Sequence, residues 1–133
     1  MFKGEKAAAQ PLYEQAAREF QSLRDKGDES LFLADNLIQV TARLGRRDEV
    51  ARQANALIEQ TSKDQWRFPR TKEVLARTYL VLGDIDRALP LVEQALSMQG
   101  ETSLTAATLR LDPTWDAVRS DPRFVKLVSE QHR

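Results

Sequence analysis

The chain has 133 residues, which is the size of one ordinary domain or of a short repeat array. Its 20 Lys and Arg residues balance its 20 Asp and Glu residues, so no basic lobe indicates binding to nucleic acid or to an anionic membrane. It contains no Cys, and its one His is His132. These two facts exclude disulfides and Cys-ligated metals, and they argue against an active site built on imidazole.

Apolar residues recur at spacings of three and four along most of the chain, which is the period of an amphipathic helix. No stretch alternates as a half-buried strand does. In chain order the apolar stripes run through residues 13–23, 31–44, 50–58, 75–82 and 88–96. The sequence therefore predicts an all-α fold.

Glycine and acidic residues mark the predicted helix boundaries. Gly45 and Gly83 stand where a helix C-terminus would need a positive φ, and both connections are very short. Short connections make neighbouring helices antiparallel, so we expect two helical hairpins. Asp28, Asp48 and Asp84 are each expected to cap the following helix by accepting backbone N–H bonds.

An internal repeat relates the two ends of this helical region. Residues 9–16 (AQPLYEQA) parallel residues 88–95 (ALPLVEQA), with Pro11 and Pro90 in the same place. An interior proline costs a backbone hydrogen bond, so its recurrence is unusual in unrelated helices. The pattern predicts that these two segments are equivalent helices of one repeating unit.

Three glycines extend the repeat to a third copy. Gly4, Gly45 and Gly83 are each followed by apolar or small residues at the same three offsets, namely 5, 9 and 12 positions later. We therefore expect all three glycines to mark equivalent bends between paired helices.

The last 30 residues differ in character. Asp112-Pro113 and Asp121-Pro122 each read as a helix N-cap followed by the first helical residue. A short helix is expected between residues 101 and 110. Five apolar residues are predicted to cover the open end of the array, as repeat arrays require: Trp115, Val118, Phe124, Leu127 and Val128.

The repeat resembles the tetratricopeptide repeat (TPR). The family's small and aromatic positions are matched best in residues 70–100, by Ala76, Tyr79, Gly83, Ala88 and Ala95. Val92 replaces the family's aromatic residue and Gly100 its closing proline, and the copy at residues 30–61 matches poorly. The resemblance implies a right-handed stack of antiparallel hairpins, an α-solenoid with a C-terminal capping helix.

On that basis we expect four segments. They are helix B of a truncated first repeat (1–25), a degenerate second hairpin (28–61), a third hairpin (66–100) and a C-terminal cap (101–133). Because the first segment lacks its helix A, the chain is expected to be cut from a longer protein, with Met1 as an engineered start. The alternative is a native amphipathic N-terminal helix.

The segment around Trp115–Arg119 and Asp121–Phe124 resembles the one that closes TPR regions in bacterial multidomain signalling proteins. These include nucleotide cyclases, serine/threonine kinases and winged-helix regulators. The resemblance implies a protein–protein interaction module with sensing or scaffolding functions, which binds a peptide or protein in a concave groove. A cytoplasmic location is expected from the sequence, which has no Cys, no long apolar run and no signal-peptide segment at its start. The alternative is a structural or oligomerisation element, a homodimer formed through residues 9–23.

The TPR resemblance places the groove on the polar faces of the first helices of the hairpins. The residues expected there are Asp35, Asn36, Gln39, Arg43, Arg70, Glu73 and Arg77. Asn36 is at a position that the family often uses to hold a peptide backbone. Asp35 and Gln39 stand where a carboxylate clamp would have Lys and Asn, which argues against that mode of binding. Trp66 and Phe68 could face a ligand, but packing between hairpins is the favoured interpretation.

Catalysis is not expected. The paired carboxylates, such as Asp48-Glu49, lie at helix starts, where they interact favourably with the helix dipole. The sequence has neither a G-x-S-x-G elbow nor a glycine-rich phosphate loop. We therefore predict no catalytic residue, no metal site and no cofactor. The partner is expected to be a protein or peptide, with no nucleic acid and no membrane insertion.

Overall fold

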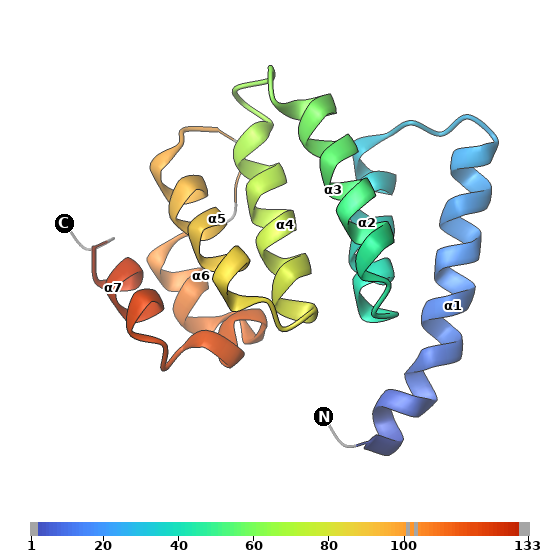
Figure 1. The fold of residues 1–133 in the computed structure, drawn as a ribbon. Helices are drawn as coiled ribbons and strands as arrows, with labels where there is room; N and C mark the ends of the chain where they lie inside the picture. The colour runs from blue at the N-terminus through green and yellow to red at the C-terminus, as the bar shows by residue number, and fades with distance from the viewer. Residues whose placement is uncertain (1–2, 101, 103, 131–133) are drawn as a thin grey trace. The chain divides into compact units, whose positions relative to one another are not determined.

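The computed structural model describes residues 3–100, 102 and 104–130, with side chains from residue 8 onward, and this part of the chain is helical without strands (Figure 1). The predicted all-α class is confirmed. In chain order the elements are α1 (Lys3–Asp25), α2 (Leu31–Arg43), α3 (Arg47–Thr61), α4 (Phe68–Val81), α5 (Ile85–Ser97), α6 (Ala106–Leu111), the 3₁₀ helix η1 (Pro113–Val118) and α7 (Pro122–Glu130).

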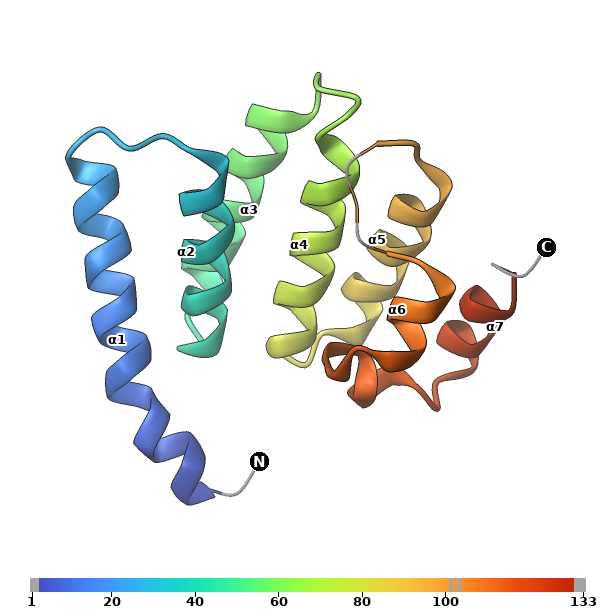
Figure 2. The same cartoon turned by 180° about the vertical axis from the view of Figure 1, so that it is seen from behind.

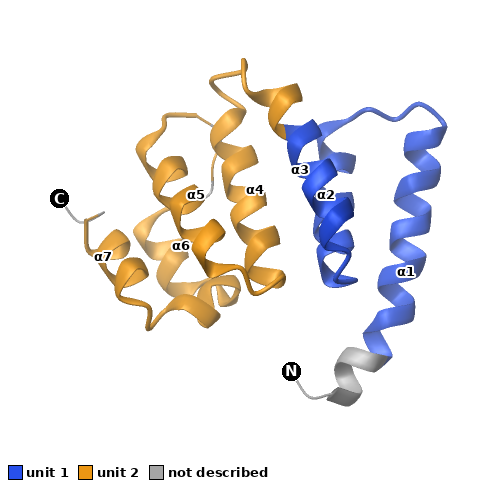
Figure 3. Ribbon diagram, viewed as in Figure 1, with its two compact units in different colours: residues 1–57 blue, residues 58–133 orange. Residues whose placement is uncertain are grey.

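The helices belong to two compact units, unit 1 (residues 1–57) and unit 2 (residues 58–133), which Figure 3 colours separately. The boundary falls inside α3, so this helix contributes to both units. The predicted division into four segments, and the predicted stacking of hairpins, stay predictions.

In unit 1, α1 packs against α2. The Arg43 guanidinium of α2 lies 5.7 Å from the ring centroid of Tyr13 on α1, a cation–π distance. In α3 the buried apolar residues repeat at steps of three and four, as the predicted stripe requires: Val50, Ala54 and Leu57. The burial of α2 is wider than one stripe, because its buried apolar residues are Leu33, Leu37, Ile38, Val40 and Ala42.

In unit 2, α4 and α5 lie side by side, which Figures 1 and 2 show from opposite directions. Their buried residues form one cluster with those of the C-terminal segment. Trp115 is completely buried, and its ring lies 6.3 Å from that of Phe124 in a stacked arrangement. The predicted burial of the closing residues is confirmed, because Val118 and Leu127 are also buried and Val128 packs against the cluster.

The turns after α2 and α4 have the same hydrogen-bond pattern. The N–H groups of Gly45 and Arg46 donate to carbonyls of Ala42 and Thr41 (2.9 and 3.3 Å), and the N–H groups that follow α4 repeat this pairing. This is the Schellman motif, which requires a positive φ at the glycine. Gly45 has φ +72° and Gly83 φ +79°, which confirms both predicted helix ends.

Three predicted boundary residues are placed differently. The expected bend at Gly4 is wrong, because α1 begins at Lys3 and already includes this residue. The expected cap at Asp28 is wrong as well, because Ser30 accepts the N–H of Leu33 and is the N-cap of α2. Asp48 lies within the first turn of α3 instead of preceding it.

Other predicted caps are confirmed. Asp84 accepts the N–H of Arg87 (3.3 Å) and caps α5. Asp112 and Asp121 accept N–H groups two residues later, at 2.9 Å each, and each precedes a proline at the first helical position. The short helix expected between residues 101 and 110 is α6, which extends to Leu111.

Candidate functional site

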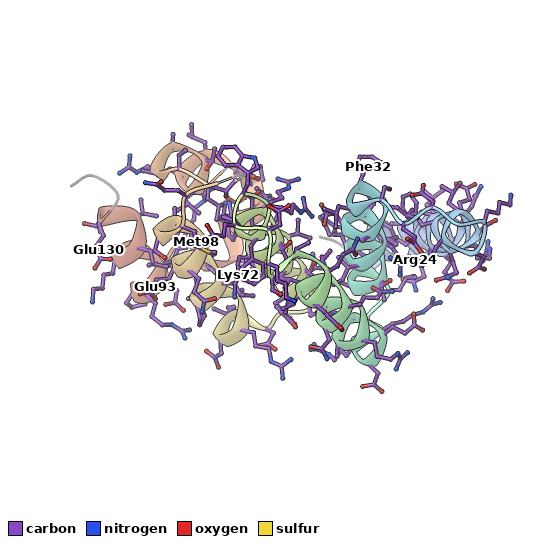
Figure 4. All side chains as sticks on the ribbon, turned by 90° about the horizontal axis from the view of Figure 1, so that it is seen from above. Arg24, Phe32, Lys72, Glu93, Met98 and Glu130 are labelled. Carbon is purple, nitrogen blue, oxygen red and sulfur yellow. The ribbon has the colours of Figure 1, made fainter. Side chains whose placement is uncertain are left out.

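One face of α2 carries polar residues and an exposed aromatic ring. Phe32, Asn36, Gln39 and Arg43 follow one another at steps of four, three and four residues, so they form a single stripe along the helix. Phe32 is 77% exposed, and Figure 4 shows its side chain projecting from α2. We call these four residues the α2 stripe. Aromatic side chains are common among the residues that dominate binding at protein interfaces, so the exposed ring is a candidate contact.

Two members of the α2 stripe also have contacts within unit 1. The Asn36 side-chain amide donates to the carbonyl of Phe32 (2.8 Å), which holds the amide on the helix surface. Arg43 is exposed and lies over Tyr13, as described above. Gln39 is half-buried.

The seven residues predicted to line the groove are divided between the two units. Asp35, Asn36, Gln39 and Arg43 belong to α2 in unit 1, and the other three belong to α4 in unit 2. Their role in binding a partner stays a prediction.

Glu73 lies within the protein and not on a solvated face. Its side chain is fully buried, so the expectation that it faces solvent is wrong. Its carboxylate pairs with Arg70 (3.2 Å) and Arg77 (3.3 Å), and it accepts a hydrogen bond from the Thr102 hydroxyl (2.8 Å). Burial of a charge is costly unless it is paired and hydrogen-bonded, and these partners provide that compensation.

Arg77 connects α4 to the C-terminal segment of unit 2. Its guanidinium pairs with Asp112 (3.0 Å), donates to the Thr114 hydroxyl (2.9 Å) and lies 5.2 Å from the ring centroid of Trp115. The Arg77 side chain is 20% exposed. Its contacts therefore stabilise the packing of the cap.

Asp35 and Glu73 occupy the same place relative to the turns that follow. Asp35 precedes Gly45 by ten residues, and Glu73 precedes Gly83 by ten residues. Both side chains are buried, Asp35 with 8% and Glu73 with 0% exposure. The helices before the two glycine turns thus each carry a buried acid at the same register position, a similarity that the apolar pattern of the sequence did not reveal.

The two aromatic residues around the start of α4 differ in exposure. Trp66 is 68% exposed, so the expectation that it packs between hairpins is wrong. Phe68 is half-buried, and the Lys72 ammonium lies 4.8 Å from its ring centroid. The sequence analysis did not predict Phe32 as a candidate binding residue. The signal that could have identified it is its position four residues before Asn36, on the same helix face as Asn36 and Gln39.

Three aspartates have lowered pKa values. Hydrogen bonds to Ser30, first to its backbone N–H, lower the pKa of the Asp28 carboxyl. The N–H of Thr114 lowers the pKa of Asp112 most, and Arg77 adds to this effect. Arg123 lowers the pKa of Asp121 through its side chain and its N–H. Asp112 and Asp121 lie at helix starts, whereas Asp28 accepts the N–H of Ser30 in the loop before α2.

In the part of the chain that the structure describes, His, Asp and Glu residues form no group of three that could hold a metal ion. None of the helices in the described ranges combines the length and apolar character that crossing a membrane requires. Comparison with known proteins found no matching family model, no matching curated protein and no matching solved structure.

Proposed function

We propose that the chain is a TPR-like protein–protein interaction module that serves a larger bacterial signalling protein as a sensing or scaffolding part. The observation that carries the proposal is the α2 stripe, where the 77% exposed ring of Phe32 stands in line with the amides of Asn36 and Gln39. An aromatic anchor supplies affinity, and the neighbouring amides and Arg43 orient a peptide by hydrogen bonds.

Two features support a repeat architecture. The Schellman turns at Gly45 and Gly83 have the same hydrogen-bond pattern, and each is preceded by a buried acid ten residues earlier. The burial of Trp115 and Phe124 against α4 and α5 residues agrees with a cap over the last hairpin. Both features suit a stack of similar hairpins.

The proposal is tested by capturing partners from a bacterial lysate with the immobilised chain and with its Phe32→Ser and Gln39→Ala variants. Phe32 is exposed, so its replacement should leave the circular dichroism spectrum unchanged. Loss of an aromatic hot spot costs at least about 2 kcal/mol, which corresponds to roughly thirtyfold weaker binding.

The matched control is Arg52→Ala, because Arg52 is an exposed residue of α3 in the same unit that does not belong to the stripe. It should recover the same partner as the parent chain. Equal recovery by the parent and both stripe variants would show that this face does not bind the partner.

The alternative function, self-association through residues 9–23, is favoured by two exposed leucines of α1. Leu12 is 66% and Leu23 46% exposed, and a separation of eleven residues places both on one helix face. Multi-angle light scattering over a hundredfold range of concentration distinguishes the two functions. A constant monomeric mass argues against a homodimer, and a dimer that Leu12→Ser dissociates supports it.

A further inference from the structure

We propose that unit 2 contains a second binding site, a hollow between α6 and α7 that takes a small molecule with an apolar body and one carboxylate. The hollow has a volume of about 390 Å³, within the range of small-ligand sites. The helices α6 and α7 that border it pack against each other (Figure 2). The site lies wholly within unit 2, so it adds a ligand class to the proposed function and does not depend on the α2 stripe of unit 1.

The walls of the hollow that α7 supplies are mainly apolar. Val125 and Val128 line it from one face of the helix, since they lie three positions apart, and Phe124 lies one turn before Val128. Val125 is 52% exposed and Val128 is half-buried, so a ligand can reach both side chains. Phe124 is 3% exposed, and its ring is stacked on that of Trp115, which fixes the base of the hollow. An apolar body that covers the two valines removes their surface from water.

Arg110 supplies a cation that has no carboxylate partner. It is exposed in the last turn of α6 and makes no ion pair within the described ranges. Arg119, the other charged lining residue, is held by the Asp116 carboxylate (2.7 Å) and by the carbonyls of Leu109 and Asp112 (2.8 and 2.7 Å). None of the described lining residues is Asp or Glu, so the lining is positively charged and favours an anion.

The charge of Arg110 determines which anion fits. A guanidinium binds a carboxylate through two parallel hydrogen bonds. One unpaired guanidinium balances a single negative charge, whereas a phosphate group carries roughly two at neutral pH. Ser129, which is exposed and also lines the hollow, adds a hydroxyl that can donate to an anion. The hollow therefore suits a monocarboxylate whose apolar body lies on the valines.

The test is a titration of the ¹⁵N-labelled full chain with three probes, followed by NMR. 3-Phenylpropionate has the apolar body and the carboxylate, 3-phenylpropanamide replaces the carboxylate by a neutral amide, and acetate lacks the apolar body. With 3-phenylpropionate we expect saturable shifts at the backbone amides of the lining residues, at a dissociation constant of about 1 mM. The amide and acetate should each bind at least about tenfold more weakly, because each lacks one of the two groups that the site recognises.

Two variants assign the contacts. Arg110→Gln should abolish the preference for 3-phenylpropionate over its amide, while the amide binds as before. Val125→Ser should weaken both phenyl probes alike, by about fourfold for each methylene-sized contact that is lost. Both residues are exposed, so the circular dichroism spectra of the variants should match that of the parent chain.

Lys126→Gln is the matched control. Lys126 is a 78% exposed cation of α7 that does not line the hollow, and its replacement changes the net charge by the same amount as Arg110→Gln. It should leave the affinities for all three probes unchanged.

The absence of saturable shifts at the lining residues would overturn this inference. Equal affinities for 3-phenylpropionate and its amide would overturn it as well, and so would a preference for the acid that survives in Arg110→Gln. Acetate binding as tight as that of 3-phenylpropionate would identify an adventitious ion only, and the inference would again be wrong. Each of these results leaves the proposed function standing, because that function is tested through Phe32 and Gln39 in unit 1.

Discussion

At the scale of residues, the Glu73 carboxylate is the charge whose surroundings matter most for stability. It is fully buried, and its pairs with Arg70 and Arg77 offset the loss of hydration. Because Arg77 also contacts Asp112 and Trp115, one guanidinium links α4 to the cap. A substitution at Arg77 therefore changes stability as well as any binding surface, and Arg77 is not suited to a binding test.

We predict that Arg77→Met destabilises the chain by about 3 kcal/mol, because removal of one partner leaves a buried charge poorly compensated. The estimate is at the lower end of the usual range, since Arg70 remains 3.2 Å from Glu73. In a double-mutant cycle with Glu73→Gln, the coupling should amount to about 1–3 kcal/mol. Urea unfolding followed by circular dichroism measures both values.

Arg87→Met is the matched control. Arg87 also forms an ion pair and a cation–π contact, with Asp84 (3.3 Å) and Tyr79 (5.7 Å), but its side chain is 66% exposed. Solvent screens such pairs, so its loss should cost less than about 1 kcal/mol. Equal losses of unfolding free energy in Arg77→Met and Arg87→Met would show that the burial of Glu73 does not determine how strongly Glu73 and Arg77 interact.

At the scale of elements, glycine fulfils two different requirements. At Gly83 the φ of +79° needs glycine, although an added Cβ would meet no atom within 4 Å. At Gly100, with φ +146°, a Cβ would lie 2.5 Å from the backbone oxygen of Trp66. The loop after α5 thus approaches the backbone before α4 at a point where a side chain does not fit. Proline is excluded at this position by its fixed φ near −65°.

We predict that Gly83→Ala costs about 1–2 kcal/mol, the cost of a left-handed conformation with a Cβ. Gly100→Ala should cost about 1–3 kcal/mol more, because the clash is with backbone and not with a movable side chain. Thermal unfolding of the two variants and of Gly45→Ala checks this order, since Gly45 also has open space. Equal losses of unfolding free energy in all three variants would contradict the close contact between Gly100 and the backbone oxygen of Trp66.

At the scale of the whole molecule, two of the three aspartates with lowered pKa values lie in the same part of the chain. Of the three aspartates with lowered pKa values, Asp112 and Asp121 lie in the C-terminal part of unit 2, and Asp28 lies in unit 1. A lowered pKa means that folding favours the ionised carboxylate. The stabilisation is therefore present above the unfolded-state pKa and is lost as pH falls through the folded-state pKa.

We predict that the free energy of unfolding of unit 2 falls as the pH decreases below about 4, which is near the pKa of an unfolded aspartate. Asp112→Asn should be less stable than the parent at pH 7. The difference should shrink as the pH falls from about 4 through the lowered pKa of Asp112, below which both side chains are neutral. Fluorescence of the buried Trp115 in a Trp66→Phe background reports on unit 2. A pH-independent difference would show that the charge of Asp112 contributes nothing.

How far the sequence alone predicts the chain depends on the range of the interactions. The helices, the glycine turns at Gly45 and Gly83 and the Asp-Pro helix starts are correctly predicted, because each depends on residues within about four positions. The errors at Gly4 and Asp28 have the same origin, since several nearby residues could serve as a helix boundary. Ser30 stands two residues after Asp28 and caps the helix instead.

The side-chain environment of the predicted groove residues could not be read in this way. Helical periodicity places Glu73 and Arg77 on a polar face, but it does not tell that Thr102, Asp112 and Trp115 approach that face from far along the chain. Likewise, nothing local distinguishes the exposed Trp66 from the buried Trp115. Local hydrogen bonds and apolar spacing thus determine the helices, while tertiary packing alone decides which polar and aromatic side chains lose contact with water.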